Sequence, residues 1–196
     1  MNKKINLIIG SGVLGAYLSA NLLKKKEKVI VTTRLIRKKM QNYDYLKIQK
    51  KVKFEKLDVN KKTSIQKIIN KYRPDKIFYF AGQSSLTKSL KYQKETLQSH
   101  FNGTKNFLDV LKEKNLKIKF FKANSGYIFS PHKGRIDLNC KFSSSKNPYI
   151  KAQKKSFKLL KKYRQFGLNL SNSVFMQVES PLTSKDFFTK KVCRGA

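Results

Sequence analysis

Residues 4–15 read KINLIIGSGVLG, and this stretch decides the fold that the sequence predicts. Residues 4–9 form a short apolar run, which is typical of a buried strand. Residues 13–25 carry apolar side chains at helical spacing, which predicts an amphipathic helix. The apolar helical positions are Leu14, Tyr17, Leu18 and Leu22. A strand that passes through glycines directly into a helix is the context in which a dinucleotide-binding loop is expected.

The three glycines of this stretch fit the pattern GxGxxG. In that pattern Gly10 permits a tight turn, Gly12 lets the backbone approach a pyrophosphate, and Gly15 allows the helix to pack against the strand. The helix then begins at Val13 and Leu14, where free amides and the positive end of the helix dipole face the phosphates. We therefore predict cofactor contacts at these five residues. The alternative is a structural turn that binds no ligand.

Strand and helix patterns alternate along the rest of the chain. The further strands are predicted at residues 28–33, 52–57, 77–80, 119–123 and 168–175. The further helices are predicted at residues 63–72, 93–114 and 148–166. Alternating units of this kind imply an α/β fold, a Rossmann-like doubly wound parallel sheet with helices on both faces. Ligands of such sheets bind beyond the carboxyl ends of the strands, so site residues are expected directly after strands.

The composition limits the class of protein. With 196 residues the chain suits one domain with a hydrophobic core. No run of eighteen apolar residues occurs, so no membrane span is expected. The start of the chain is typical of a first strand rather than of a signal peptide. Cys140 and Cys193 lie far apart in the sequence, without a cluster of His or Cys, so we expect no metal site and reduced thiols in a cytoplasmic protein.

The formal net charge is +34, from 45 Lys and Arg against 11 Asp and Glu. A charge of this size raises the hypothesis of nucleic-acid binding. The lysines are spread through every segment, however, and the sequence contains no RNP-like aromatic motif, zinc knuckle or basic arm. We therefore interpret the charge as a lysine-rich solvated surface, part of which favours an anionic ligand. Nucleic-acid binding is the less favoured alternative.

The end of the second predicted strand bears on which dinucleotide is bound. NAD enzymes usually place an acid there on the ribose hydroxyl. This chain has Thr33 and Arg34, with Arg37 nearby, and an arginine suits a 2′-phosphate. NADP is therefore favoured over NAD, although Arg34 alternatively belongs to the basic surface. Asp58, which Val59 follows, is expected either to accept a hydrogen bond from the adenine amino group or to cap the helix after it.

Residues 73–85, RPDKIFYFAGQSS, resemble a strand and turn of the extended short-chain dehydrogenases that act on nucleotide sugars, the NAD-dependent epimerase and dehydratase family. In that family the turn reads Ala-Ala-Gln-Ser and borders both the dinucleotide and the sugar. Residues 103–108, GTKNFL, are similar to its Gly-Thr-x-x-Leu-Leu helix. The family's glycine loop is usually GxxGxxG, so the loop of this chain departs from it. The resemblance implies cofactor contacts at Ala81 and Gly82 and substrate contacts at Gln83, Ser84 and Ser85.

The tail narrows the resemblance to GDP-mannose 4,6-dehydratases. Residues 179–181, ESP, and 186–192, DFFTKKV, are similar to the Glu-Ser-Pro and Phe-Val-Thr-Arg-Lys signature of those enzymes. Family members continue into a C-terminal lobe that completes the sugar-nucleotide site, so this lobe is expected to be largely missing here. We expect a Rossmann domain over residues 1–176 and the start of a truncated lobe over 177–196. The resemblance implies substrate contacts at Gln177, Glu179 and Lys191.

The resemblance also implies a reaction and four catalytic side chains. In the family, hydride leaves sugar C4 for NADP, water is lost across C5 and C6, and the hydride returns to C6. A Ser or Thr and a Glu follow the fifth strand, and a Tyr and a Lys form the pattern YxxxK. Ser125, which would also contact the substrate, matches the Ser or Thr, and Tyr149 matches the tyrosine. Tyr127 stands at the Glu position and Gln153 at the Lys position, and Tyr149 and Gln153 are also expected beside the cofactor.

These two replacements weaken the expected chemistry. A tyrosine titrates near a pKa of ~10, so only about one part in a thousand is phenolate at neutral pH. The family's lysine lowers that pKa, whereas Gln153 brings no charge. The adjacent Lys154 is turned by roughly 100° on a helix, so it is a poor substitute. Without a carboxylate at position 127 the C5 proton has no obvious acceptor. His100, expected on the long helix, and His132, expected in a loop, are candidate substitutes without a supporting motif.

The resemblance as a whole predicts an NADP-dependent nucleotide-sugar dehydratase of the GDP-mannose type, impaired in turnover. A catalytically inactive nucleotide-binding remnant is the first alternative, because of Tyr127, Gln153 and the early end of the chain. Another nucleotide-sugar epimerase or reductase of the same family is the second, because these enzymes need no elimination base. Association as a dimer or tetramer is implied by resemblance only.

Overall fold

The computed structural model describes residues 3–131, 134–137 and 139–195. Its six strands form one parallel sheet in the order β3-β2-β1-β4-β5-β6. Chain order reverses between β1 and β4, which is the switch point of a doubly wound sheet. The predicted Rossmann-like fold is therefore confirmed. The strands are β1 (Ile5–Ile9), β2 (Lys28–Thr33), β3 (Lys53–Lys56), β4 (Lys76–Tyr79), β5 (Lys119–Ser125) and β6 (Leu170–Phe175).

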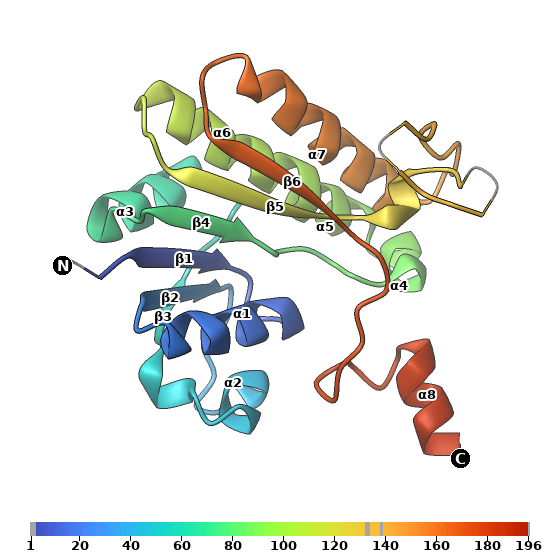
Figure 1. Ribbon diagram of the computed structural model, residues 1–196, viewed down its shortest axis with the longest axis horizontal. Coiled ribbons are helices and arrows are strands. Elements are labelled where there is room, and N and C mark those ends of the chain that lie inside the picture. The colour runs from blue at the N-terminus through green and yellow to red at the C-terminus, as the bar shows by residue number, and fades with distance from the viewer. Residues whose placement is uncertain (1–2, 132–133, 138, 196) are drawn as a thin grey trace.

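Helices cover both faces of this sheet, with α6 and α7 on one side and α1 on the other (Figure 1). Strand β1 is buried on both faces, since Leu7 and Ile9 pack into the core beneath α3, α6 and α7 while Ile8 packs beneath α1. The helices are α1 (Val13–Lys24), α2 (Gln41–Tyr45), α3 (Lys62–Tyr72), α4 (Leu86–Lys91), α5 (Gln93–Leu97), α6 (Gly103–Glu113), α7 (Pro148–Arg164) and α8 (Phe188–Gly195).

The predicted helix over residues 93–114 is interrupted. A π-helical turn at Gln98–Asn102 separates α5 from α6. Single π-helical turns within α-helices are frequent at functional sites. Hydrophobic periodicity did not reveal it, because the apolar positions on either side keep helical spacing. The short helices α2 and α4 and the terminal α8 were likewise not predicted, and the predicted strand and helix ends differ by one or two residues.

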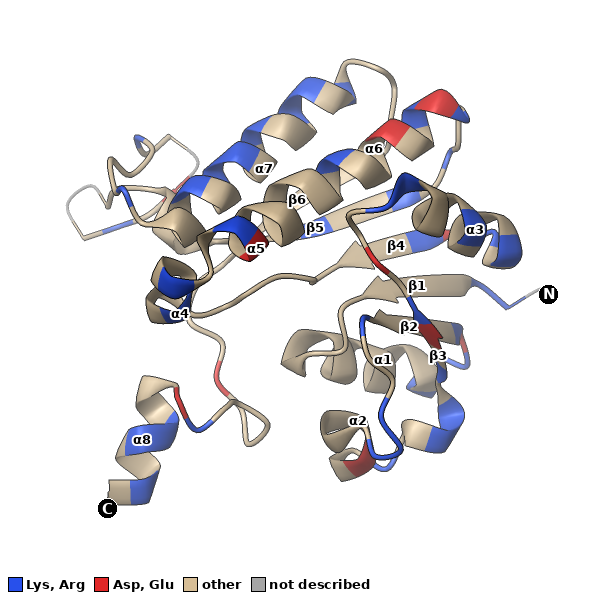
Figure 2. Ribbon diagram, turned by 180° about the vertical axis from the view of Figure 1, so that it is seen from behind, with Lys and Arg blue, Asp and Glu red and all other residues tan. Residues whose placement is uncertain are grey.

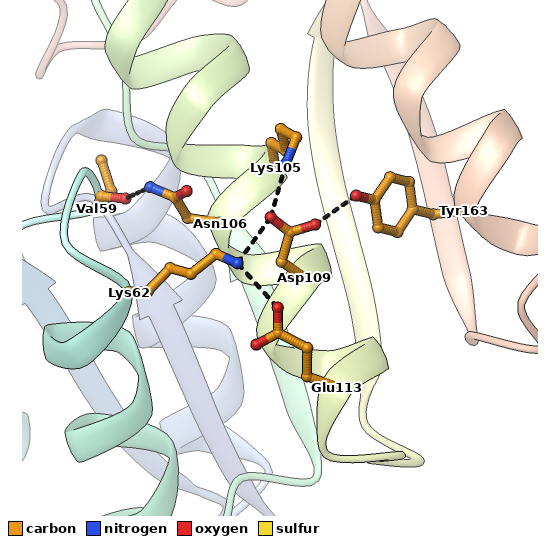
Figure 3. A network of polar contacts seen from close by, with 7 residues as sticks. All are labelled: Val59, Lys62, Lys105, Asn106, Asp109, Glu113 and Tyr163. Atoms are coloured by element: carbon orange, nitrogen blue, oxygen red, sulfur yellow. Dashed lines mark hydrogen bonds and ion pairs between the residues drawn. The ribbon is translucent and has the colours of Figure 1, made fainter.

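A polar network ties α3, α6 and α7 together at the end of the helical layer (Figure 3). The carboxylate of Asp109 on α6 accepts from Lys105 at 2.8 Å and pairs with Lys62 of α3 at 3.1 Å. It also accepts from the hydroxyl of Tyr163 on α7. Asp109 is only 8% exposed, so its charge is balanced within the layer rather than by bulk water.

The chain after β6 leaves the sheet and ends in α8, which lies apart from both helical layers (Figure 1). No residue of α8 is buried, and Phe188 and Val192 are exposed. An exposed ion pair joins Asp186 to Lys88 of α4, and Leu182 packs against the core beneath α1. Among the described helices, none is long and apolar enough to cross a membrane.

Candidate functional site

The glycine loop lies where β1 passes into α1, at the carboxyl edge of the sheet. Gly10 has φ +106°, and a Cβ there would lie 2.9 Å from the backbone nitrogen of Ala81. The turn after β1 therefore packs directly on the turn after β4. A Cβ at Gly15 would lie 2.4 Å from the Gly10 carbonyl oxygen. These two contacts explain why the fold itself needs glycine at both positions.

Gly12 differs from the other two glycines. A Cβ there would meet nothing within 4 Å, so the fold leaves open space in front of it. Gly12 is the N-cap of α1, and no side chain caps the helix, whose first turn holds no acidic residue. The amides of Val13 and Leu14 are thus available to an anion at the positive end of the helix dipole.

A cavity of about 570 Å³ lies beside this loop, between Ser11 and the segment after β2. Arg34, Arg37 and Lys39 line it, and no carboxylate is among the described residues of its lining. Tyr43 of α2 forms part of its wall, and burial raises the pKa of the Tyr43 hydroxyl well above its usual range. The arrangement suits a phosphate group, because Arg34 and Arg37 line the space and Lys39, which pairs with Asp44 at 3.0 Å, adds a third cation.

Asp58 and Val59 follow β3 on the same edge of the sheet. The Oδ1 atom of Asp58 accepts a hydrogen bond from the backbone nitrogen of Asn60 at 3.0 Å, which closes a turn. Asp58 does not cap α3, because the N-cap residue of that helix is Lys61 and no side chain caps it. The carbonyl of Val59 accepts from the side chain of Asn106 at 3.0 Å (Figure 3). Val59 packs against Gly103, where a Cβ would approach its side chain to 2.7 Å. Both residues therefore have structural partners at this edge.

The turn after β4 holds the residues that the resemblance assigned to cofactor and sugar. Gly82 has φ +146° and lies against the His100 ring, while Ala81 contacts Gly10. The side chain of Gln83 accepts from the backbone nitrogen of Ser85 at 2.8 Å. The hydroxyl of Ser85 in turn accepts from the Lys88 nitrogen and caps α4, whereas Ser84 is exposed.

Ser125 and Tyr149 come together between the end of β5 and the start of α7. The N-cap residue Asn147 accepts from the backbone nitrogen of Tyr149 at 2.9 Å, and Pro148 occupies the first turn as predicted. Burial raises the pKa of Tyr149, while the nearby polar side chains of Ser125 and Gln153 act in the opposite direction. The phenol is therefore protonated at neutral pH, and the predicted pair Ser125 and Tyr149 does converge.

The two replaced positions have different surroundings. Tyr127 lies on the 3-10 turn Gly126–Ile128 and is 57% exposed. Gln153 is 4% exposed, and its Nε2 lies 3.4 Å from Nδ1 of His100. Lys154 cannot replace the family's lysine, because α7 is regular there and its Nζ donates to the carbonyl of Ser143 at 2.5 Å.

His100 lies in the site and Lys122 lies near it, although neither has a motif around it in the sequence. His100, on the π-helical turn, contacts Gln83, Gln153 and Tyr149. Lys122 on β5 is 1% exposed, and its Nζ donates to the carbonyl of Ala123 at 2.6 Å. Burial lowers the pKa of Lys122 to about 7. A lysine within a predicted strand was the available signal, since buried lysines are rare. His132 lies outside the described residues.

The predicted substrate residues of the tail are exposed. Gln177 donates to Glu179 at 2.9 Å, and Lys191 lies on α8. The start of the tail reaches the site, because a Cβ at Gly126 would lie 2.2 Å from the sulfur of Met176. Within the described ranges, no hydrogen bond connects the three predicted substrate residues to Ser125 or Tyr149.

Two further sequence predictions concern metals and charge. Residues 3–131, 134–137 and 139–195 contain no group of three His, Cys, Asp or Glu that could hold a metal ion. Cys140 and Cys193 are free thiols. Basic residues are distributed over many elements, including α3, α7 and α8 (Figure 2).

Comparison with known proteins matches this chain to one family model. The model for GDP-mannose 4,6 dehydratase matches residues 7–196. The GDP-mannose 4,6-dehydratase of Vibrio cholerae serotype O1 is 25% identical over 205 residues, which cover 100% of this chain and 55% of that protein. The GDP-mannose 4,6 dehydratase of Drosophila melanogaster is 27% identical, over 98% of this chain and 51% of that protein. The chain thus spans about half the length of these curated relatives.

Solved structures give the same fold at lower identity. The dTDP-glucose 4,6-dehydratase of Streptomyces venezuelae, solved with NAD, superposes with a TM-score of 0.83 at 16% identity, over 97% of this chain and 62% of that one. A curated relative of different activity, the CDP-paratose 2-epimerase of Salmonella typhi, is 26% identical over 64% of this chain and 38% of its own length. Because the family model covers nearly every residue, the chain belongs to the GDP-mannose 4,6-dehydratase family.

Proposed function

We propose that this chain binds a nicotinamide dinucleotide at the glycine loop and prefers NADP to NAD. The residues present fit the group, because the uncapped first turn of α1 suits a pyrophosphate and the space before Gly12 admits it. The cavity lined by Arg34, Arg37 and Lys39 is the observation that supports the preference for NADP over NAD. A 2′-phosphate gains charge-assisted hydrogen bonds there, whereas the ribose of NAD meets no carboxylate among the described lining residues.

Calorimetric titration with NADP and NAD tests this preference. We expect the dissociation constant for NADP to be lower by about tenfold or more, as for one charge-assisted hydrogen bond. The substitution Arg34→Ala should remove most of that difference and leave NAD binding unchanged. Lys161→Ala, an exposed change on α7, is the matched control for loss of positive charge. Equal affinities of the unaltered protein for the two dinucleotides would refute the preference.

We propose dehydration of a nucleotide sugar of the GDP-mannose type as the activity, with slow turnover. The bound dinucleotide supplies the hydride acceptor. Tyr149 would take the proton of the sugar C4 hydroxyl, and Ser125 would hold the same oxygen. The raised pKa of Tyr149 and the neutral Gln153 both support a slow step, since the phenolate is scarce at neutral pH. Tyr127 offers no carboxylate for the C5 proton.

Incubation with GDP-mannose and NADP, followed by mass spectrometry for the loss of one water, tests the activity. The 4-keto-6-deoxy product is expected at a low rate. The combined substitutions Tyr127→Glu and Gln153→Lys should raise that rate if the substrate pocket is intact. No product from either protein, with the fold and NADP binding intact, would overturn the dehydratase proposal.

Binding without catalysis is the second candidate, and the exposed Tyr127 with the buried neutral Gln153 favours it. NADP would then raise the melting temperature with no turnover of any nucleotide sugar. An epimerase or reductase is the third candidate, favoured by the epimerase relative of Salmonella typhi. Chromatographic separation of sugar epimers in the same incubation distinguishes it.

We also propose that residues 1–176 are the cofactor domain and that residues 177–196 begin the substrate lobe. The exposed tail and α8, which has no buried residue, support this boundary. The nucleotide sugar is the proposed partner, and a dimer or tetramer in the cytoplasm is the proposed state. Light scattering after size-exclusion chromatography measures the oligomer. Nucleic acid is the less favoured partner, because the basic residues are dispersed (Figure 2).

A further inference from the structure

His100 connects three parts of the candidate site. It lies on the π-helical turn Gln98–Asn102 and is 4% exposed. Its Nε2 lies 2.7 Å from the carbonyl oxygen of Gln83, and its Nδ1 lies 3.4 Å from Nε2 of Gln153. Its ring meets the ring of Tyr149 edge to face, with centroids 5.3 Å apart. One buried imidazole therefore joins the turn after β4 to the start of α7.

The partners of His100 fix its tautomer. The carbonyl oxygen of Gln83 can only accept, so Nε2 of His100 carries the hydrogen. Nδ1 is then an acceptor, and Gln153 donates to it through Nε2. Burial lowers the pKa of His100 to about 3, and the nearby charge of Lys122 acts in the same direction. His100 is therefore neutral at ordinary pH and does not supply the positive charge of the family's lysine.

Two residues at which this chain departs from the family pattern, Gly82 and Gln153, both contact the His100 ring. Gly82 stands where the family turn has its second alanine, and a Cβ at that position would lie 2.1 Å from the His100 ring. Gln153 stands where the family has lysine, and it is the donor to His100. The imidazole fits only because residue 82 is glycine, so the three residues form one connected arrangement.

This arrangement leaves one atom of Gln153 free. The Oε1 of Gln153 is buried and has no hydrogen-bond partner among the described residues. An unpartnered buried amide oxygen is unfavourable, and a hydroxyl donor would relieve that cost. With Nε2 of Gln153 held by His100, Oε1 is the atom left for such a donor, beside the phenol of Tyr149.

We propose that His100 is a positioning residue that orients the Gln153 amide, so that Gln153 Oε1 accepts a hydrogen bond from a ribose hydroxyl of the dinucleotide. The inference rests on the proposed cofactor binding. A neutral acceptor held by an imidazole thus takes the place that a charged donor has in the YxxxK pattern. Position 153 would still orient the cofactor, while the activation of Tyr149 by charge is lost.

Nitrogen-15 NMR of the imidazoles tests the positioning without any ligand. The chain has only two histidines, so His132→Gln assigns both signals. We expect His100 to remain neutral with hydrogen on Nε2 from about pH 5 to 8, as a strongly lowered pKa requires. The substitution Gln153→Leu should shift the Nδ1 resonance of His100 and leave His132 unchanged. Hydrogen on Nδ1, or titration of His100 near its ordinary pKa, would overturn the proposal.

A double-mutant cycle on NADP affinity tests the consequence. His100→Phe keeps an aromatic ring and loses both nitrogens, and Gln153→Leu loses the amide. Each should weaken NADP binding by about tenfold, and the double variant no more than either alone, because both remove one hydrogen bond. His132→Phe is the matched control. Additive losses would refute the coupling, whereas no NADP binding by the unaltered protein would refute only the proposed cofactor function, with the NMR result still decisive for the positioning.

Discussion

Lys122 points from β5 into the core, where its Nζ lies 5.2 Å from the centre of the Tyr79 ring and donates to one carbonyl. An ammonium group normally makes three donations, so this one is poorly compensated. Burial lowers its pKa to about 7, and its charge also disfavours a cation on His100. At the residue scale the buried Lys122 therefore disfavours a second cation at His100, which stays neutral.

The substitution Lys122→Met should stabilise the protein in a pH-dependent way. A lysine side chain in the unfolded chain has a pKa of ~10.4. Between about pH 7 and 10 the unfolded state therefore binds more protons than the folded state. The cost of burying Lys122 is therefore largest at and below pH 7 and disappears above pH 10. We expect Lys122→Met to raise the melting temperature by about 5 °C at pH 7, a gain on the order of 2 kcal/mol, and by almost nothing at pH 10.5.

Thermal melts at pH 6, 8 and 10 measure this effect. Lys119→Met, on the same strand but exposed, is the control and should show no pH-dependent difference. A Lys122→Met protein that is less stable than the unaltered protein at every pH would contradict the account of Lys122 as a poorly compensated cation.

At the scale of elements, the unit β1-loop-α1 separates folding from binding. Gly15 is needed by the fold because a Cβ there meets the Gly10 carbonyl, whereas Gly12 faces open space. The sequence pattern predicted a loop at the three glycines, with a strand before it and a helix after it. The pattern also assigned packing to Gly15 and the approach of a pyrophosphate to Gly12. It did not predict that Gly10 packs against Ala81, because that contact depends on the turn after β4.

The matched pair Gly15→Ala and Gly12→Ala makes this division measurable. We expect Gly15→Ala to lower the melting temperature by about 5 °C or more, because overpacking costs roughly 1–3 kcal/mol. Gly12→Ala should leave the melting temperature unchanged and weaken NADP binding by about tenfold, because its methyl group would occupy the approach of the pyrophosphate. Equal losses of stability in the two variants, measured by thermal melts with calorimetric titration, would contradict the division.

The network around Asp109 fastens α3, α6 and α7 to one another (Figure 3). Burial by itself raises the pKa of Asp109, but hydrogen bonds from Lys105, Tyr163 and Lys62 prevail and lower it. A lowered carboxyl pKa stabilises the fold above the unfolded value, and this contribution is lost as the pH falls through the folded value. Asp109→Asn should therefore cost about 1–3 kcal/mol at pH 7 and less near pH 3.

Urea denaturation of Asp109→Asn at the two pH values measures that difference. Glu113→Gln is the control, because Glu113 pairs with Lys62 but its side chain is 52% exposed, and such pairs contribute little. If Glu113→Gln is as destabilising as Asp109→Asn, the contribution of the network to stability does not depend on the burial of Asp109.

At the scale of the molecule, the sequence predicted the architecture better than the site. The order of strands and helices follows from periodicity and the glycine loop, and both are local signals. His100 and Lys122 could not be assigned from sequence, because their partners Gln83, Gln153 and Tyr79 lie 17 or more residues away and meet them only through the sheet and the π-helical turn. At position 153 the sequence shows only a loss of charge, whereas the structure shows an amide that contacts His100.

The net charge of +34 leads to a prediction for the whole chain. Basic residues cover most elements, so the folded state concentrates like charges that the unfolded chain spreads out (Figure 2). Salt screens this repulsion over about 10 Å at 0.1 M. We therefore expect the melting temperature to rise by about 5 °C or more between 20 mM and 500 mM sodium chloride, as a gain on the order of 2 kcal/mol would give.

Sodium sulfate at equal ionic strength separates screening from anion binding. A larger rise in sulfate that Arg34→Ala reduces would indicate an anion bound in the cavity after β2, whereas equal rises in the two proteins indicate screening alone. A melting temperature that is constant or falls with sodium chloride would contradict the self-repulsion. In that case the few acidic residues would be compensating the basic surface locally, as Asp109 does between Lys62 and Lys105.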